Sequence, residues 1–235
     1  MELARLLSSQ GFGSRAQCRA LVAAGGVTVA GQVCADPWAE FSGDGLVFVV
    51  NGEAWRYRRF AYLALNKPEG YECSQRPSRH PSVYSLLPAP IATRGVQAVG
   101  RLDQDTTGLL LLSDDGQFIH ACTSPRKQVA KEYLVTTRHV VDDRQLADLV
   151  RGVALHGEVS PVAATACVRL HERCLRLTVT LGKYHLVKRM LAAVGNRVEQ
   201  LRRVRIGGFD LPPNLGSGCW QWLEAEQVAA ILGSG

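Results

Sequence analysis

Charged side chains stand directly in front of an apolar stretch in GRLDQDTTGLLLLSDDG, residues 100–116. Arg101, Asp103 and Asp105 precede four consecutive leucines. A carboxylate held at the edge of a buried strand is suited to act on a substrate, because burial and neighbouring charges tune its reactivity. The alternative is a tight turn, since Asp commonly bonds the local backbone in turns. Residue type alone favours the turn.

The same stretch also matches a short pattern that is typical of phosphoryl transfer. DQDTT follows the Asp-x-Asp-x-Thr pattern of haloacid-dehalogenase-type phosphatases, in which an apolar strand runs directly into the first Asp. In this chain Gly100 and Arg101 precede the carboxylate and the leucines follow it. A calcium loop fits no better, because leucines stand where oxygen ligands are needed. A magnesium-dependent phosphatase therefore remains the least supported hypothesis for this stretch.

Regular apolar patterns surround the charged group. AYLALNK at 61–67, the four leucines, KEYLVTT at 131–137 and LRLTVTL each predict a strand. VDDRQLADLV predicts a helix, and HLVKRMLAAVGN spaces its apolar residues as one face of a helix that ends at Gly195. This mixture of strands and helices predicts an α+β fold.

Residues 1–58 are expected to form a small separate unit, and residues 59–235 the main one. The small unit is predicted to hold two short helices followed by a small sheet, with Ser14 as the N-cap of the second helix. Arg15 and Arg19 lie i, i+4 apart and share one face of that helix. The segment AWRYRRF is expected to connect the two units.

Composition limits the class of protein. The chain has 235 residues, a net charge of +6 and seven cysteines without a CxxC pair, which is typical of reduced thiols in the cytoplasm. The sequence has no signal-peptide pattern and no apolar run long enough for a membrane helix. The basic segment, residues 182–205, alone carries a net charge of +6, against +1 for residues 1–60. Such clustering favours binding to nucleic acid.

Several motifs in collinear order resemble those of the pseudouridine synthases, in particular the RsuA type that acts on small-subunit ribosomal RNA. GRLDQDTTG resembles the family hallmark Gly-Arg-Leu-Asp-x-x-Thr-x-Gly. The further matches are LNKPEGYECS, TSPRKQVAKEYLVT, LGKYHLVKRMLAAVGN and RIGGF. Residues 1–58 resemble the S4 RNA-binding module that precedes the catalytic domain in this subfamily. The family usually has Gln where this chain has Leu186.

The resemblance implies a fold, a reaction and a set of active-site residues. The catalytic domain would have a mixed, largely antiparallel sheet, and the reaction would isomerise uridine without a cofactor or metal. Asp103 would be the catalytic carboxylate, Lys188 its basic partner and Tyr133 the ring on which the flipped base stacks. Arg101 would help to hold the flipped nucleotide, and Asp105 is interpreted as a turn residue.

RNA binding is expected from arginines in two regions. Arg189 is interpreted as a phosphate contact, and Arg15 and Arg19 as contacts of the S4 module. The basic segment is predicted to supply most of the electrostatic attraction to RNA, through Arg202, Arg203 and Arg205.

The sequence therefore predicts a cytoplasmic, monomeric RNA pseudouridine synthase whose partner is 16S rRNA in an assembling small subunit. Two alternatives stay open: a 23S rRNA pseudouridine synthase of a related subfamily, and a catalytically weak RNA-binding or ribosome-assembly protein with the same fold.

Overall fold

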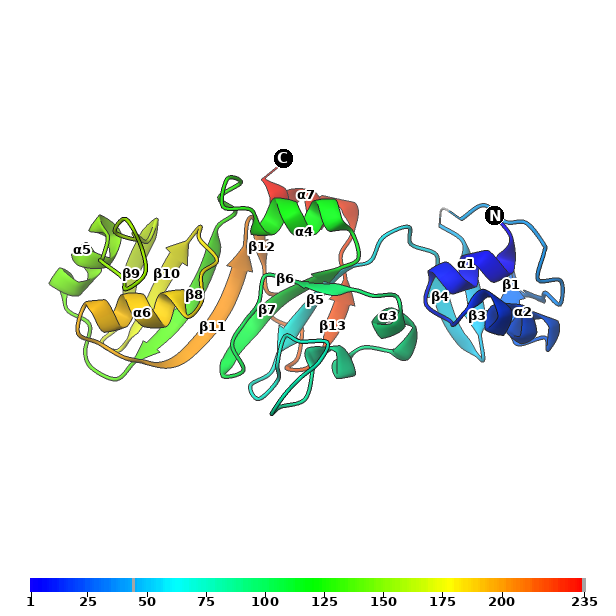
Figure 1. The fold of residues 1–235 in the computed structure, drawn as a ribbon, viewed down its shortest axis with the longest axis horizontal. Helices are drawn as coiled ribbons and strands as arrows, with labels where there is room; N and C mark the ends of the chain where they lie inside the picture. The colour runs from blue at the N-terminus through cyan, green and yellow to red at the C-terminus, as the bar shows by residue number, and fades with distance from the viewer. Residues whose placement is uncertain (44, 234–235) are drawn as a thin grey trace. The chain divides into compact units, whose positions relative to one another are not determined.

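The structure is a computed structural model that describes residues 1–43 and 45–233. The chain forms two compact units (Figure 1). Unit 1 contains Met1–Ala61 together with Leu87–Gln97, and unit 2 contains Tyr62–Leu86 together with Ala98–Gly235. Unit 1 thus includes a second, later segment of the chain, in addition to the N-terminal residues. Within it, Arg94 donates hydrogen bonds to the side chain of Gln10 and to the carbonyl of Arg58.

Unit 1 packs two helices against a four-stranded sheet whose order is β2-β1-β3-β4. The elements are α1 (Leu3–Ser9), α2 (Arg15–Ala23), β1 (Val27–Val29), β2 (Gln32–Val33), β3 (Val47–Val50), β4 (Glu53–Arg56) and the later α3 (Ala89–Thr93). The predicted N-cap is confirmed: Ser14 and Gln17 form a reciprocal capping box at the start of α2. Residues 53–56, partly assigned to a connection from the sequence, instead form β4 at the edge of this sheet.

Unit 2 is built on a mixed sheet of order β13-β5-β7-β11-β8-β10-β9, with β6 beside β7 and β12 beside β11. Neighbouring strands on this path are antiparallel except β7 and β11, which run parallel, so the predicted largely antiparallel α+β fold is confirmed. The strands are β5 (Tyr62–Lys67), β6 (Gln97–Val99), β7 (Thr106–Ser113), β8 (Lys131–Thr137), β9 (Ala166–His171), β10 (Cys174–Val179), β11 (Val198–Ile206), β12 (Phe209–Asp210) and β13 (Trp220–Trp222).

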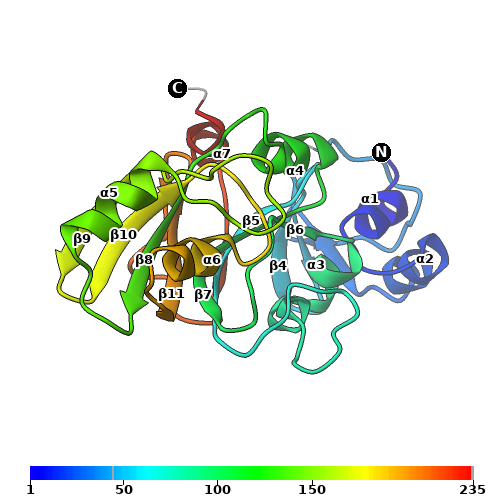
Figure 2. The ribbon, with the colours of Figure 1, turned by 60° about the vertical axis from the view of Figure 1, so that its left-hand side comes forward.

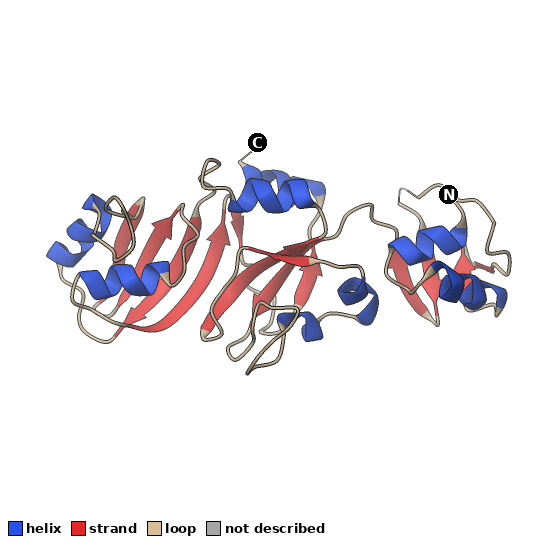
Figure 3. Cartoon of the chain, viewed as in Figure 1, coloured by secondary structure: helices blue, strands red, loops and turns tan. Residues whose placement is uncertain are grey.

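The helices of unit 2 complete two cores (Figures 2 and 3). α5 and α6 bury one face of the β8–β10 region, whereas α4 and α7 pack near β7 and β12. The bounds are η1 (Val83–Leu86), α4 (Gly116–Thr123), α5 (Asp143–Arg151), α6 (Leu186–Ala193) and α7 (Ala225–Leu232). The four leucines of β7 and the apolar stripe of α6 are buried, as their spacing predicted. No helix in the described part of the chain is long and apolar enough to cross a membrane.

A close backbone approach brings the start of β7 against β11. Gly108 has a φ of +97°, and a Cβ at this position would lie 2.2 Å from the carbonyl oxygen of Arg203. Only glycine fits here without displacing one strand, because both the left-handed backbone and the contact with a neighbouring strand exclude a side chain. The glycine therefore lets β7 pair in parallel with β11 and places Asp103, a few residues earlier, beside the middle of the sheet.

Candidate active site

Unit 2 contains a pocket of about 830 Å³ beside the N-terminal end of α6 and the start of β7. Arg101, Asp103, Tyr133 and Lys188 all line it. These residues come from three distant parts of the chain. They meet because β7, β11 and β8 are neighbours in the sheet and α6, which carries Lys188, packs against β11. The four side chains expected to contact the substrate therefore share one cavity.

Lys188 lies between two carboxylates. Its Nζ is 3.1 Å from Oδ2 of Asp103, and it donates hydrogen bonds of 2.7 and 2.9 Å to the two carboxylate oxygens of Asp105. The predicted pairing of Lys188 with Asp103 thus has the required geometry. Asp105 lies in a turn, as interpreted, and its carboxylate also makes the shorter contacts with the shared cation.

The two carboxylates affect the ionisation of Lys188. Burial of the ammonium group by itself lowers the pKa of Lys188, but its hydrogen bonds to Asp105 and Asp103 and their charges outweigh that effect and hold the pKa above the ordinary value. The side chain of Asp103 is 28% exposed at the pocket wall, so a substrate reaches it from the cavity. The arrangement presents a carboxylate that is both accessible and electrostatically compensated.

His185 also contacts the carboxylate of Asp103. It caps the N-terminus of α6 with a left-handed backbone (φ 49°), and its Nε2 lies 3.4 Å from Oδ1 of Asp103. The ring of Tyr184 stacks on it with centroids 3.7 Å apart and is 77% exposed. These two neighbours in the segment GKYHLVKRM therefore place aromatic rings at the pocket, which analysis of the sequence overlooked.

The segment LNKPEGYECS stabilises the loop that carries Asp103 through hydrogen bonds to its backbone. Lys67 is fully buried, and its Nζ donates to three backbone carbonyls, those of Pro68, Gln104 and Thr106, at 2.9 to 3.1 Å. The amide of Gly70 donates to the same Gln104 carbonyl. Burial lowers the pKa of Lys67, and nearby groups, the two aspartates among them, partly offset this. Two motifs that are separate in the sequence therefore form one structural unit.

Tyr133 reaches the pocket because of the alternation of β8. Lys131 and Tyr133 point to the pocket face, and Val135 on the same face belongs to the core under α6. Lys131 is buried and donates to the carbonyl of Cys122, and burial lowers its pKa. Tyr133 is flanked by Arg203 of β11 and Leu177 of β10, so its position is fixed by strands on both sides.

Arg189 does not stand free toward solvent. Its Nη1 is 3.4 Å from Oε1 of Glu158, and its Nη2 donates to the carbonyl of His156. Lys183 bonds the same Glu158 carboxylate, which lowers the pKa of that carboxyl. These contacts of Arg189 order the chain near the pocket, and its interpretation as a phosphate contact stays a prediction.

The three arginines of β11 do not form one surface. Arg203 is only 3% exposed, and its Nε donates to the carbonyl of Leu109. Arg202 lies between two pocket-facing residues and points to the other face of the sheet. Arg205 pairs with Asp210, with bonds of 2.6 and 3.1 Å. The expectation that all three arginines attract RNA is therefore wrong for Arg203, which is buried.

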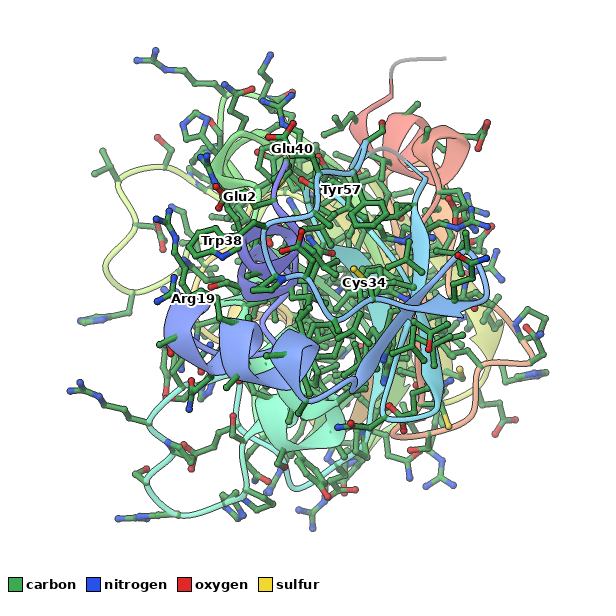
Figure 4. The ribbon with its side chains drawn as sticks, turned by 90° about the vertical axis from the view of Figure 1, so that its right-hand side faces the viewer. Glu2, Arg19, Cys34, Trp38, Glu40 and Tyr57 are labelled. Carbon is green, nitrogen blue, oxygen red and sulfur yellow. The ribbon has the colours of Figure 1, made fainter. Side chains whose placement is uncertain are left out.

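In unit 1, the predicted S4 residues lie on α2. Arg15 is exposed, and the guanidinium of Arg19 lies over the ring of Trp38, 5.6 Å from its centroid (Figure 4). Trp38 is 57% exposed. Arg15 and Arg19 therefore remain predicted RNA contacts on one helix face, and an exposed aromatic ring accompanies the second of them.

The residues that sequence reasoning missed share one feature: their partners are distant in the chain. Asp105, Glu158, His185 and Lys67 make contacts that no local pattern reveals. For Asp105, His185 and Lys67, the available signal was their position inside segments that resemble the family motifs; Glu158 lies outside these segments and gave no such signal. Among the described residues, no three His, Cys, Asp or Glu side chains form a group that could hold a metal ion.

Comparison with known proteins agrees with this geometry. The RNA pseudouridylate synthase family matches residues 61–193, and the S4 domain family matches residues 1–37. "Ribosomal small subunit pseudouridine synthase A" of Escherichia coli (strain K12) is 44% identical over 171 residues, 73% of this chain and 74% of that protein.

Two relatives match nearly the whole chain. An uncharacterized RNA pseudouridine synthase of Bacillus subtilis (strain 168) is 37% identical over 231 residues, 97% of each protein. A crystal structure of a pseudouridylate synthase is 32% identical, superposes with a TM-score of 0.70, and covers 98% of this chain and 99% of its own. The family match spans more than half of the sequence and contains Asp103, Tyr133 and Lys188. This chain belongs to the RNA pseudouridylate synthase family.

Proposed function

We propose that this protein isomerises a uridine of 16S rRNA to pseudouridine in the assembling small subunit, with Asp103 as the catalytic carboxylate. The observation that carries the proposal is the placement of this carboxylate in the pocket wall beside Lys188, Tyr133 and Arg101. The small-subunit substrate is supported by the names of relatives at 44 to 45% identity. We expect the protein to work in the cytoplasm as a monomer.

The reaction rearranges one nucleotide. The bond from ribose C1′ to uracil N1 breaks, a bond from C1′ to C5 forms, the proton on C5 leaves and N1 becomes protonated, so that nothing is added or lost. A uridine within structured RNA must first leave the base stack, at a cost of a few kcal/mol. Stacking on an aromatic ring returns about 1–3 kcal/mol per base, and Tyr133 is positioned to provide it.

The residues have separate roles in this proposal. Asp103, paired with Lys188, acts on the flipped nucleotide, and Asp105 holds the ammonium group in place from the other side. Arg101 is exposed at the pocket and helps to hold the flipped nucleotide. Lys67 keeps the backbone of the catalytic loop rigid through its three carbonyl contacts.

An Asp103→Asn variant tests the proposal. We expect it to lose turnover while RNA binding falls little, because the amide keeps the shape of the side chain and removes the charge. Asp210→Asn is the matched control: it removes one carboxylate that pairs with Arg205 outside the pocket, and we expect it to remain active. The measurement is mapping of new pseudouridines in unmodified naked and partly assembled rRNA, in magnesium and in EDTA.

Three results would contradict the proposal. Substantial turnover by Asp103→Asn would exclude this carboxylate as the catalytic group. New pseudouridines only in 23S rRNA would move the enzyme to the related subfamily. A strict metal requirement for the chemical step on pre-folded RNA would revive a phosphatase-like chemistry.

A further inference from the structure

Two cations in the pocket wall, Lys183 and Lys188, are already bonded to carboxylates of the protein. Lys188 is shared by Asp103 and Asp105, and Lys183 and Arg189 both bond Glu158. An RNA strand whose base enters this pocket brings its phosphates to the rim, where they require cations that are not neutralised by nearby carboxylates. The rim therefore has to be searched for exposed basic side chains.

A loop of residues 75–81 supplies such side chains. It carries Arg76, Arg79 and His80, all exposed, and Arg79 and His80 line the pocket. The sequence from residue 73 to residue 99 contains no Asp or Glu. The loop therefore gives the pocket rim exposed positive charge with no acidic residue in the same stretch of sequence.

The loop is closed at its base by the backbone. The amide of Glu72 donates to the carbonyl of Pro81 at 2.9 Å, and the amide of Val83 donates to the carbonyl of Glu72 at 3.0 Å. The hydroxyl of Ser82 donates to the carbonyl of Ser74 at 2.6 Å. These bonds join the two ends of the loop, so that its tip projects from a fixed base.

The side chain of Glu72 then fixes the tip. Its carboxylate accepts hydrogen bonds from the backbone amides of Ser78, Arg79 and His80, at 3.0 to 3.1 Å. These amide bonds lower the pKa of Glu72 to about 2, so the group is ionised throughout the neutral range. Because the backbone is already ordered, the protein loses less conformational entropy when the loop binds a partner.

We propose that the loop of residues 75–81 binds the phosphate backbone of the RNA strand beside the flipped uridine, with Arg76 and Arg79 as the phosphate ligands and Glu72 as the positioning residue. This inference rests on the proposed function. Arginine suits the role because its planar guanidinium bonds phosphate oxygens in pairs. The position of Arg79 in the pocket wall places that charge where the nucleotide enters.

The first test compares two double variants of the full chain that remove equal charge. Arg76→Gln with Arg79→Gln alters the loop. Arg202→Gln with Arg205→Gln is the control, because the first arginine faces away from the pocket and the second is paired with Asp210. Binding to unmodified 16S rRNA is titrated over a salt series, and KM and kcat are measured separately.

We expect the loop variant to flatten the slope of log affinity against log salt by roughly one to two units, at about 0.7 to 0.9 per phosphate contact. KM should rise roughly 3- to 30-fold with kcat almost unchanged, because exposed charge contacts are individually modest. The control should keep the wild-type slope and KM. The proposal is overturned if the loop variant keeps the wild-type slope, or if the control flattens it as much.

Glu72 provides a second, independent test through the sign of the effect. Removing an acid beside two arginines should strengthen RNA binding if net charge alone mattered. If Glu72 positions the loop, Glu72→Ala should instead raise KM, and Glu72→Gln should restore part of the loss because its amide oxygen still accepts bonds from Arg79 and His80. Tighter binding by Glu72→Ala would contradict the positioning role.

The test of the phosphate-binding loop can fail or succeed independently of the assignment of Asp103 as the catalytic residue. Asp103→Asn, titrated in the same salt series, should keep the wild-type slope even though it does not turn over. If the loop variant changes the slope while Asp103→Asn proves active, the phosphate site stands and the catalytic assignment fails.

Discussion

Two cationic regions of unit 2 use their charges differently. The basic segment, residues 182–205, contains seven Lys and Arg residues, but those with described partners bond Asp103, Asp105, Glu158, Glu199 or Asp210, and Arg203 is buried. The loop of residues 75–81 has only two arginines, both exposed, and its single carboxylate neighbour bonds backbone amides.

The difference shows that the net charge of a sequence segment does not tell how many of its cations are exposed and able to bind a ligand. In the basic segment, most of the charges are paired with acids of the protein, and Lys188 compensates the carboxylates of Asp103 and Asp105. In the loop, one acid orders the backbone and leaves the arginine side chains to solvent. The first region should therefore govern turnover and stability, and the second should govern affinity for RNA.

The largest effect is expected from the cation of the basic segment that contacts both aspartates. Lys188→Met leaves Asp103 and Asp105 without their shared counter-ion, and we expect kcat to fall roughly ten- to hundred-fold, since a hydrogen bond to a charged group is worth about 1.5–3 kcal/mol. Arg189→Met, which disturbs only the contacts to Glu158 and His156, should reduce kcat far less. Single-turnover rates on one RNA would decide, and a slower Arg189 variant would reverse the assignment of the catalytic partner.

A smaller effect, on stability, is expected where β7 meets the basic segment. Gly108→Ala forces a left-handed backbone and a contact of 2.2 Å with the carbonyl of Arg203, so we expect the free energy of unfolding to fall by about 2–5 kcal/mol. Gly100→Ala is the matched control: its φ is +72°, but the nearest atom, in Thr123, lies 4.0 Å away. Denaturant unfolding of both variants separates the clash from the backbone strain. Equal losses would show that β7 and β11 can adjust.

The smallest effect is expected from the anchor of the loop, and it depends on pH. The pKa of Glu72 is about 2 in the folded protein, below the ordinary value of 4.5, so ionisation of this group stabilises the fold above about pH 4.5. That contribution is lost as the pH falls from 4.5 toward 2. The difference in unfolding free energy between wild type and Glu72→Ala should therefore shrink over this range. A difference independent of pH would mean that the ionised carboxylate does not hold the loop.

The elements of the fold were largely readable from the sequence. The leucines of β7, the alternation of β8 and the stripe of α6 follow local periodicity, which depends only on residues within one element. The capping box at Ser14 is equally local. One misassignment, the connection that includes β4, arose because an edge strand rich in Arg and Trp lacks clean alternation.

The candidate site was readable only in part. The motif around Asp103, with Tyr133 and Lys188, pointed to the residues that line the pocket, because the order of motifs in the chain is a property of the sequence. The ion pair of Asp105 was missed, and Arg203 was wrongly expected to contact RNA, for one reason. Whether a charged side chain is exposed, paired or buried depends on what the sheet places beside it.

The sequence by itself thus determined which segments become strands and helices, and which family-like motifs carry the chemistry, because both are encoded in short stretches. Only the tertiary structure decided the partners. Lys188 and Asp105 are 83 positions apart, and Lys67 reaches a carbonyl 39 positions away. Such contacts form only once β7 has paired with β11 and the loop of Asp103 lies over buried Lys67, since charged groups that leave water require partners that the fold brings to them.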